Sequence, residues 1–560
     1  MKKNKYHLLT IVLSLALSFN TIIVKGMSTK VDDVNYTIKN ESVTTDDGLK
    51  LATDVYLPIE EGKFACVLLR TPYGKDAFVG AFPDSVKWFI KNNLVMVTQD
   101  CRGKLLSQGR FYPFRNERRD GLATLKWIRE QPWSNGKVAG WGSSYCGCTQ
   151  WAISDKLDVL AVPYTGAEPY DLIYPGGLFS LATAFNWGFI VDANTANVIP
   201  PEKHAASYSI LPLSQADDLT YRDNKFMNDW LSHQHNDQYW QQQSCRGSVN
   251  TPTLSIAGWY DIFLFSQIAD FQALADSHPD NKLVIDPFCH GPQGFKNEFG
   301  GNEKIGDREN LLQKFVFEHL KGEKIDLEVG AYKDKKYSLF IIERNEYYGA
   351  DEWPPKNTTL TNYYVGPNKY LSPVIPQEKG NLEYTYDPAD PYPSRGGTSL
   401  AEGVGQALQN ENLSRSDQVV FETDILKSPL ILLGPISATL YVSSDAPGTD
   451  FIVCLQDVFP NGNIINIQEG GATVNFEQED SIKKSCFSVW ATGYQLNPEH
   501  KLRVVITSSW FPRFNRNINS GKPIFSAETI RTANQKIYFG QDHPSAITLP
   551  VLKLEDDQCK

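Results

Sequence analysis

The sequence predicts an α/β fold class, in which an α/β-layered domain is interrupted by a helical segment and followed by a β-sandwich. Three observations lead to this prediction. Strand and helix patterns alternate between residues 40 and 165, strand patterns fade between 170 and 248, and short strand-like runs separated by turns dominate beyond 345. A chain of 560 residues is long enough to build several hydrophobic cores.

The composition is that of a folded globular protein, with 41% hydrophobic, 12% aromatic and 21% charged residues. The 65 acidic residues outnumber the 54 basic ones, so the net charge is −11. Binding to nucleic acid requires a basic surface, and the charge of the whole chain does not supply one. We therefore expect no nucleic-acid partner.

Residues 1–26 are typical of a secretory signal peptide. Lys2, Lys3 and Lys5 precede an apolar run from Leu8 to Phe19, which is short for a membrane span. We expect an exported protein, periplasmic or secreted, whose cleavage site the sequence leaves open. A retained anchor is the alternative, because apolar residues resume soon after the run. No other window reaches transmembrane length, so we expect no integral membrane span in the mature chain.

The first part of the α/β domain is expected at 40–170. The runs 65–69 and 94–98 are continuously apolar and bounded by turn residues, as in strands buried on both faces of a parallel sheet. Apolar positions recur at helical spacing in 120–131, where Pro132 then ends the helix. A short buried strand follows at 138–141 and runs into a tight turn.

A helical cap is expected at 171–248, where polar and aromatic stretches show little β-branched alternation. Strand patterns return at 253–257 and 282–285, so the cap interrupts one α/β domain, whose second part is expected at 249–344. The remaining residues, 345–560, contain short strand-like runs between turns. They predict a C-terminal β-sandwich.

Ser144 is the candidate nucleophile, because it lies in the tight turn after the strand 138–141. A serine exposed at the top of a sheet needs small neighbours, and Gly142 is one of them. The usual pattern G-x-S-x-G would place the second glycine at Cys146, but it stands at Gly147. The alternative is an ordinary turn serine.

A serine nucleophile needs a histidine base that is oriented by a carboxylate. Asp261 and His290 each follow a predicted strand, and the order serine, acid, histidine is the one that α/β-hydrolases use. Taken singly, Asp261 could be a helix N-cap and His290 a loop histidine bonded to the backbone. Together they predict a catalytic triad with Ser144.

The nine cysteines are an odd number, and their pairing cannot be deduced from the sequence. Cys146 and Cys148 have C-x-C spacing, but no second cluster at zinc-ligand spacing accompanies them. No nucleotide-binding loop, haem motif or cofactor lysine signature is present. We therefore expect no metal and no cofactor.

At this point several motifs resemble those of the cocaine-esterase / X-Pro dipeptidyl-peptidase (CocE/NonD) family of α/β-hydrolase serine hydrolases. The similarity runs from about residue 40 to residue 555. The motifs that carry it are Gln99-Asp100-Cys101-Arg102-Gly103, Ser107-x-Gly109-x-Phe111, Gln131 to Val138, Trp141 to Gly147, Gly258-Trp259-Tyr260-Asp261, Pro287-Phe288-Cys289-His290, Ser443 to Asp450 and Ser508 to Phe514.

The resemblance implies an α/β-hydrolase core with an inserted helical cap and a C-terminal jelly-roll sandwich. The family pattern is G-x-S-Y-x-G, so the departure at Cys146 is the family's own. The family forms its oxyanion hole from the backbone N–H of the residue after the serine and from an early tyrosine hydroxyl. Tyr145 and Tyr73 occupy those positions.

The resemblance also bears on the substrate. Relatives that recognise an α-amino group place carboxylates just after the catalytic aspartate, whereas Ile262, Phe263 and Leu264 follow it here. Phe263 and Trp187 match aromatic residues of an acyl pocket, with core packing as the alternative for both. An apolar acyl pocket for uncharged esters or amides is the expectation.

Two other functions remain open. An Xaa-Pro dipeptidyl-peptidase would need a cap carboxylate for the free amine of a short peptide, and Asp229 and Asp237 are candidates. A non-catalytic protein would use the β-sandwich to bind a surface partner. A homo-oligomer is compatible with either function.

Overall fold

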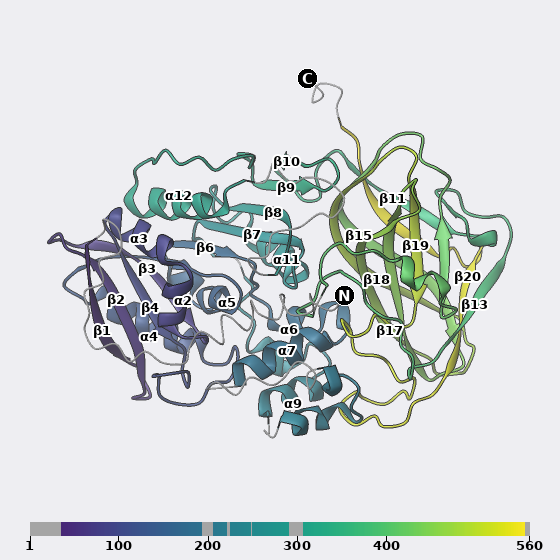
Figure 1. Ribbon diagram of the computed structural model, residues 1–560, viewed down its shortest axis with the longest axis horizontal. Coiled ribbons are helices and arrows are strands. Elements are labelled where there is room, and N and C mark those ends of the chain that lie inside the picture. Colours follow the sequence, from purple (N-terminus) through teal and green to yellow (C-terminus); the bar gives the residue numbers. More distant parts are fainter. Residues whose placement is uncertain are drawn as a thin grey trace, which may run out of the picture.

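The computed structural model describes residues 35–192, 205–220, 224–247, 249–290, 306–401 and 403–554. Figure 1 shows an α/β unit, coloured purple to teal, beside an all-β unit, coloured green to yellow. The predicted α/β domain and C-terminal β-sandwich are thus confirmed. The expected signal peptide at 1–26 lies outside the described residues.

The α/β unit contains a ten-stranded sheet with the order β1-β2-β4-β3-β5-β6-β7-β8-β9-β10. The strands from β4 to β9 in this order are parallel, while β1, β2 and β10 pair antiparallel at the two edges. Their bounds are β1 (Tyr36–Thr44), β2 (Lys50–Pro58), β3 (Phe64–Thr71), β4 (Leu94–Asp100), β5 (Ser134–Trp141), β6 (Val159–Pro163), β7 (Thr253–Tyr260), β8 (Lys282–Cys289), β9 (Tyr337–Ile341) and β10 (Glu346–Ala350).

Helices cover both faces of this sheet (Figure 1). Helices α3 and α12 contact each other on one side, and α4 and α5 contact each other on the other side. Strand β4 is buried along its whole length because it lies between these layers. The helices are α2 (Lys75–Ala81), α3 (Pro83–Lys91), α4 (Glu117–Arg129), α5 (Tyr145–Trp151), α11 (Leu264–Leu274) and α12 (Arg308–Lys321).

Between β6 and β7 the described residues form helices and no strand, as expected for an inserted cap. Aromatic side chains hold the cap together, and Trp230 and Trp240 are fully buried in it. The cap consists of α6 (Pro169–Ile173), η2 (Pro175–Gly177), α7 (Leu181–Asp192), η3 (Leu213–Thr220), α9 (Lys225–Ser232) and α10 (Gln238–Gln241).

The C-terminal unit consists of a seven-stranded and a four-stranded sheet. Alternating burial along its strands, as in β20, is the pattern of a sandwich with one face inward. The strands are β11 (Thr358–Val365), β12 (Leu371–Ser372), β13 (Gly380–Tyr386), β14 (Gln418–Glu422), β15 (Leu430–Ser444), β16 (Gly448–Val458), β17 (Ile464–Asn475), β18 (Lys483–Leu496), β19 (Lys501–Thr507), β20 (Ala533–Phe539) and β21 (Ala546–Leu552).

The boundary between the two units differs from the expected one at 344/345. Strand β10 pairs with β9 and closes the edge of the α/β sheet, so the sandwich begins with β11. The units also share backbone hydrogen bonds, because Ile342 donates to Gly493 O at 2.9 Å and accepts from Gln495 N at 3.0 Å. Sequence patterns separate strands from turns, but they do not say which sheet a short strand joins.

The structure also bears on the pairing of the cysteines and on membrane-spanning helices. Within the described ranges the eight cysteines are all free, and five of them are buried, namely Cys66, Cys101, Cys146, Cys148 and Cys454. None of the helices in these ranges is long and apolar enough to cross a bilayer.

Candidate active site

Ser144 lies at the sharp turn between β5 and α5. Its backbone has φ 56° and ψ −135°, a conformation that side-chain-bearing residues rarely adopt and that costs about 1–3 kcal/mol. Two contacts hold the turn, since Ser144 N donates to Tyr164 O at 2.9 Å and Thr165 Oγ1 donates to Ser144 O at 2.7 Å. The structure therefore maintains a strained serine at the end of a buried strand.

Steric contacts explain why glycine stands at positions 142 and 147 of this turn. A Cβ on Gly142, which has φ 148°, would lie 2.8 Å from the Cβ of Cys146. A Cβ on Gly147 would lie 2.6 Å from three atoms of Thr165. A side chain at position 147 would therefore collide with the chain after β6, which explains why a glycine stands there.

The three side chains singled out in the sequence form one hydrogen-bonded chain. His290 Nε2 lies 3.0 Å from Ser144 Oγ, and His290 Nδ1 lies 2.7 Å from Asp261 Oδ2. Asp261 is fully buried, and its other oxygen accepts the backbone N–H of Phe263 at 2.8 Å. Since a carboxylate accepts at Nδ1, the imidazole carries its proton there and offers Nε2 to the serine.

Tyr73 follows β3, and its hydroxyl lies in the enclosed interior near Ser144 and Trp187. Although 37% of the residue is exposed, the hydroxyl is its enclosed end, and burial raises the pKa of the Tyr73 phenol above its usual value. The phenol therefore stays protonated and can donate a hydrogen bond. The hydroxyl accepts a hydrogen bond from the indole N–H of Trp187 at 2.8 Å, and the nearby Ser144 side chain opposes the rise of its pKa.

The backbone N–H and the hydroxyl of Tyr145 have different surroundings. It is the first residue of α5, where the N–H has no acceptor within the helix. Its hydroxyl points away from the serine, donating to Glu117 Oε1 at 2.8 Å and accepting from Phe114 N at 2.7 Å. Glu117 in turn pairs with the fully buried Arg70 at 3.1 Å, so a buried ion pair anchors the first residue of α5.

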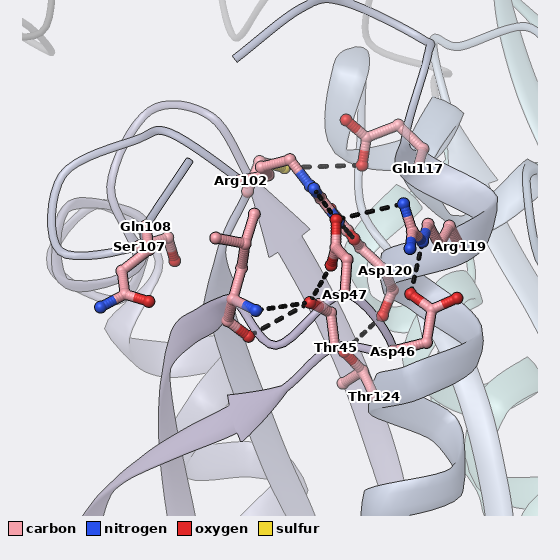
Figure 2. Close-up of polar contacts among 12 residues, drawn as sticks. Thr45, Asp46, Asp47, Arg102, Ser107, Gln108, Glu117, Arg119, Asp120 and Thr124 are labelled. Atoms are coloured by element: carbon pink, nitrogen blue, oxygen red, sulfur yellow. Dashed lines mark hydrogen bonds and ion pairs between the residues drawn. The ribbon is translucent and has the colours of Figure 1, made fainter. Parts of the chain in front are cut away.

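The turn that carries Tyr73 is held by the Gln99-Asp100-Cys101-Arg102-Gly103 motif. Asp100 Oδ1 accepts the backbone N–H of Lys75 at 2.7 Å, and burial raises the pKa of Asp100 to about 6. Figure 2 shows Arg102 between two carboxylates. Its guanidinium lies 2.6 Å from Asp47 Oδ2 and 2.5 Å from Asp120 Oδ1, which fixes the loop after β4.

The two candidate pocket residues contact different members of the site, Phe263 the ring of His290 and Trp187 the hydroxyl of Tyr73. Phe263 is buried, and its ring centroid lies 5.5 Å from that of His290. Trp187 stacks on Trp230 with centroids 5.9 Å apart and planes at 6°. Trp187 also donates its indole N–H to the Tyr73 hydroxyl, and its place in the acyl pocket, which the resemblance implies, stays a prediction.

The cap carboxylates considered as amine ligands already have partners. Asp229 accepts from the Tyr112 hydroxyl at 2.6 Å and from Lys225 Nζ at 3.1 Å. Asp237 lies 2.6 Å from His233 Nδ1. Sequence reasoning did not foresee these contacts, nor the contributions of Glu117 and Thr165 to the serine turn, because such contacts leave no periodic signal.

The arrangement can support acyl transfer. A hydroxyl is hydrogen-bonded to an imidazole, and the imidazole to a buried carboxylate, which is the arrangement of a nucleophile, its base and the group that orients the base. The fold and this site define a serine hydrolase built on an α/β-hydrolase core.

Comparisons with known proteins agree with this class. The sequence profile of the X-Pro dipeptidyl-peptidase (S15) family matches residues 47–292, and that of the X-Pro dipeptidyl-peptidase C-terminal non-catalytic domain matches residues 330–548. The cocaine esterase of Rhodococcus sp. (strain MB1 Bresler) is 31% identical over 93% of this chain and 100% of its own length. A putative serine esterase of Mycobacterium bovis is 24% identical over 91% of this chain and 95% of its own length.

Solved structures show the same fold. An aminopeptidase from a marine sediment Thaumarchaeota archaeon superposes with a TM-score of 0.81 at 22% identity, covering 96% of this chain and 100% of that one. An α-amino acid ester hydrolase superposes with a TM-score of 0.78 at 20% identity, covering 95% and 99%. The chain belongs to the CocE/NonD family, and it is a serine hydrolase acting on esters or peptides.

Proposed function

We propose that this protein is an exported serine hydrolase that cleaves acyl esters or amides through an acyl-enzyme on Ser144. His290 acts as the base and Asp261 orients it. The observation that carries the proposal is the continuous contact from Ser144 Oγ to His290 and on to the buried Asp261, at 3.0 and 2.7 Å.

In the first half-reaction, His290 Nε2 takes the proton of Ser144 as Oγ attacks the acyl carbon. The imidazolium is stabilised by the Asp261 carboxylate and then gives the proton to the leaving alcohol or amine. In the second half-reaction, His290 takes a proton from water, which attacks the acyl-enzyme and releases the acid. Ser144 regains its proton from the imidazolium.

Negative charge gathers on the acyl oxygen in both tetrahedral intermediates. The Tyr73 hydroxyl and the Tyr145 backbone N–H are the proposed donors to this oxygen. One such donor is worth about 3–4 kcal/mol of barrier, or roughly 10² to 10³ in kcat. We expect Tyr73→Phe to lower kcat by this factor with little change in KM, and an unchanged kcat would refute the role of the hydroxyl.

The proposed acyl pocket is apolar. Support comes from Ile262 and Phe263, which follow the acid and are 6% and 4% exposed, and from the aromatic cluster of the cap that packs against them. Uncharged acyl groups are expected to fit such a surface better than α-amino acyl groups, because an ammonium ion would lose its hydration without gaining a carboxylate.

A fluorophosphonate probe and an aryl ester test the proposal. The wild type should be labelled and should hydrolyse the ester, whereas Ser144→Ala should do neither. Ser143→Ala is the matched control, because it removes the neighbouring hydroxyl of the same turn. Labelling of Ser144→Ala, or its retention of ester hydrolysis, would overturn the assignment.

A second candidate, an Xaa-Pro dipeptidyl-peptidase, is favoured by the match to the S15 family. Against it stand the existing contacts of Asp229 with Lys225 and of Asp237 with His233. Hydrolysis of a chromogenic Gly-Pro amide, compared with that of a simple aryl ester, separates the two activities.

Export and assembly are tested separately. N-terminal sequencing of the secreted or periplasmic protein should reveal removal of the proposed signal peptide, residues 1–26, and a chain that retains these residues would contradict it. Size-exclusion chromatography with light scattering measures whether the protein forms a homo-oligomer.

A further inference from the structure

The contact between Trp187 and Tyr73 joins the cap to the proposed oxyanion hole. Trp187 Nε1 lies 2.8 Å from the Tyr73 hydroxyl oxygen. An indole N–H can only donate a hydrogen bond, so the phenol oxygen is the acceptor in this contact. The single proton of the phenol must then point elsewhere.

The Ser144 side chain is the other polar group that acts on the Tyr73 hydroxyl, since it lowers the pKa of the phenol against the effect of burial. With the indole occupying one side of the phenol oxygen, the phenol proton is directed to the side where Ser144 Oγ attacks. That is the side on which the acyl oxygen acquires its negative charge. The accepted hydrogen bond also polarises the phenol, which makes it a stronger donor.

The indole itself is held firmly. Trp187 stacks on Trp230 and packs against Tyr145, with ring centroids 5.9 and 5.3 Å apart. Its helix, α7, is fixed to the sandwich, because Ala182 N donates to Pro512 O at 3.0 Å and Asn186 Nδ2 donates to Leu400 O at 3.0 Å. A donor placed this way loses little entropy when the transition state forms.

We propose that Trp187 is a positioning residue, whose indole N–H orients the Tyr73 hydroxyl toward the developing oxyanion. This inference rests on the proposed function and deepens it, because it makes the cap responsible for part of the transition-state stabilisation. A residue that lines the acyl pocket would behave differently, because its substitution would change KM by an amount that depends on the size of the acyl group.

Trp187→Phe is the direct test, since it keeps an aromatic ring and removes the N–H. We expect kcat to fall about tenfold, the effect of one neutral hydrogen bond, while KM for an aryl ester changes less than twofold. Trp510→Phe is the matched control. Trp510 is fully buried in the sandwich, and among the described residues its indole N–H has no hydrogen-bond partner, so kcat should be unchanged.

A double-mutant cycle separates positioning from packing. If Trp187 acts through Tyr73, then Trp187→Phe should have no further effect on kcat in a Tyr73→Phe background. An equal loss in both backgrounds would overturn the inference, and so would a change confined to KM that depends on acyl size.

If Trp187→Phe fails to fold, the benzothienyl analogue of tryptophan at position 187 provides a second test. This analogue keeps the shape of the indole and replaces the N–H with sulfur. The same tenfold loss of kcat is expected, and a wild-type kcat would overturn the inference. Failure of the proposed function gives a different result, because Ser144→Ala would then remain active, whereas failure of the positioning role leaves Ser144→Ala inactive.

Discussion

Asp450 provides a test of how a buried carboxyl affects the stability of the sandwich. It lies in β16, is 4% exposed, and accepts hydrogen bonds from Thr473 Oγ1 at 2.7 Å and Asn517 Nδ2 at 2.8 Å. Burial raises its pKa from 3.8 to about 6, because these neutral donors only partly replace the lost hydration. The folded protein therefore holds this proton at pH values where the unfolded chain has released it.

The sign and the size of the effect follow from this difference. The stabilisation by the protonated carboxyl is complete below the unfolded pKa of 3.8 and is lost as the pH rises through about 6. A shift of about two units corresponds to about 3 kcal/mol. Asp450→Asn keeps an acceptor for both donors and cannot ionise, so it should gain up to about 3 kcal/mol over the wild type at pH 8 and little at pH 4.

Thermal unfolding of both proteins between pH 4 and pH 8 measures the effect. For a domain of this size, about 3 kcal/mol corresponds to a rise in Tm of roughly 6–12 °C at the alkaline end. Asp84→Asn is the control, because the Asp84 side chain is 97% exposed and its removal should give no pH-dependent difference. A Tm difference for Asp450→Asn that stays constant with pH would refute the reasoning.

Two other substitutions test the packing around the serine turn. Gly147→Ala should lower kcat and Tm because its Cβ would lie 2.6 Å from Thr165, whereas Gly80→Ala, in a helical position with open space, should leave kcat unchanged and raise Tm slightly. Unchanged kinetics for Gly147→Ala would show that the turn can relax. Arg70→Met should destabilise the protein by about 3–5 kcal/mol because Glu117 would remain buried without its cation, and adding Glu117→Gln should recover part of this loss in unfolding measurements. Equal stability of the single and double variants would contradict a buried ion pair.

The architecture was predictable from the sequence because its signals are local. The apolar run 94–98 predicted a strand buried on both faces, and β4 is buried throughout. Ser144, Asp261 and His290 each follow such a strand, so the rule that parallel strands end at one sheet edge was enough to expect them together. Their separation of 146 positions along the chain carries no weight once the strand order is known.

The supporting contacts were not predictable in the same way. The hydrogen bond from Trp187 to Tyr73 joins a cap helix to the end of a strand. The pattern of apolar residues in the sequence does not show which tryptophan donates a hydrogen bond. Asp237 looked available for an amine, but its partner His233 is set by the cap's own packing. Strand β10 is short and only partly buried, so its membership of the α/β sheet follows from pairing with β9 and not from pattern.

The hydrogen bonds between β7 and β17 affect when the chain can become active. Tyr260 donates to Asn466 O at 3.2 Å, and Gln468 Nε2 donates to Trp259 O at 3.2 Å, so the strand that leads to Asp261 rests on residues some 200 positions later. A nascent chain that has left the ribosome only as far as β10 already contains all three candidate catalytic residues but lacks this support. Competence for hydrolysis is therefore expected only after β17 has been synthesised and has docked against β7.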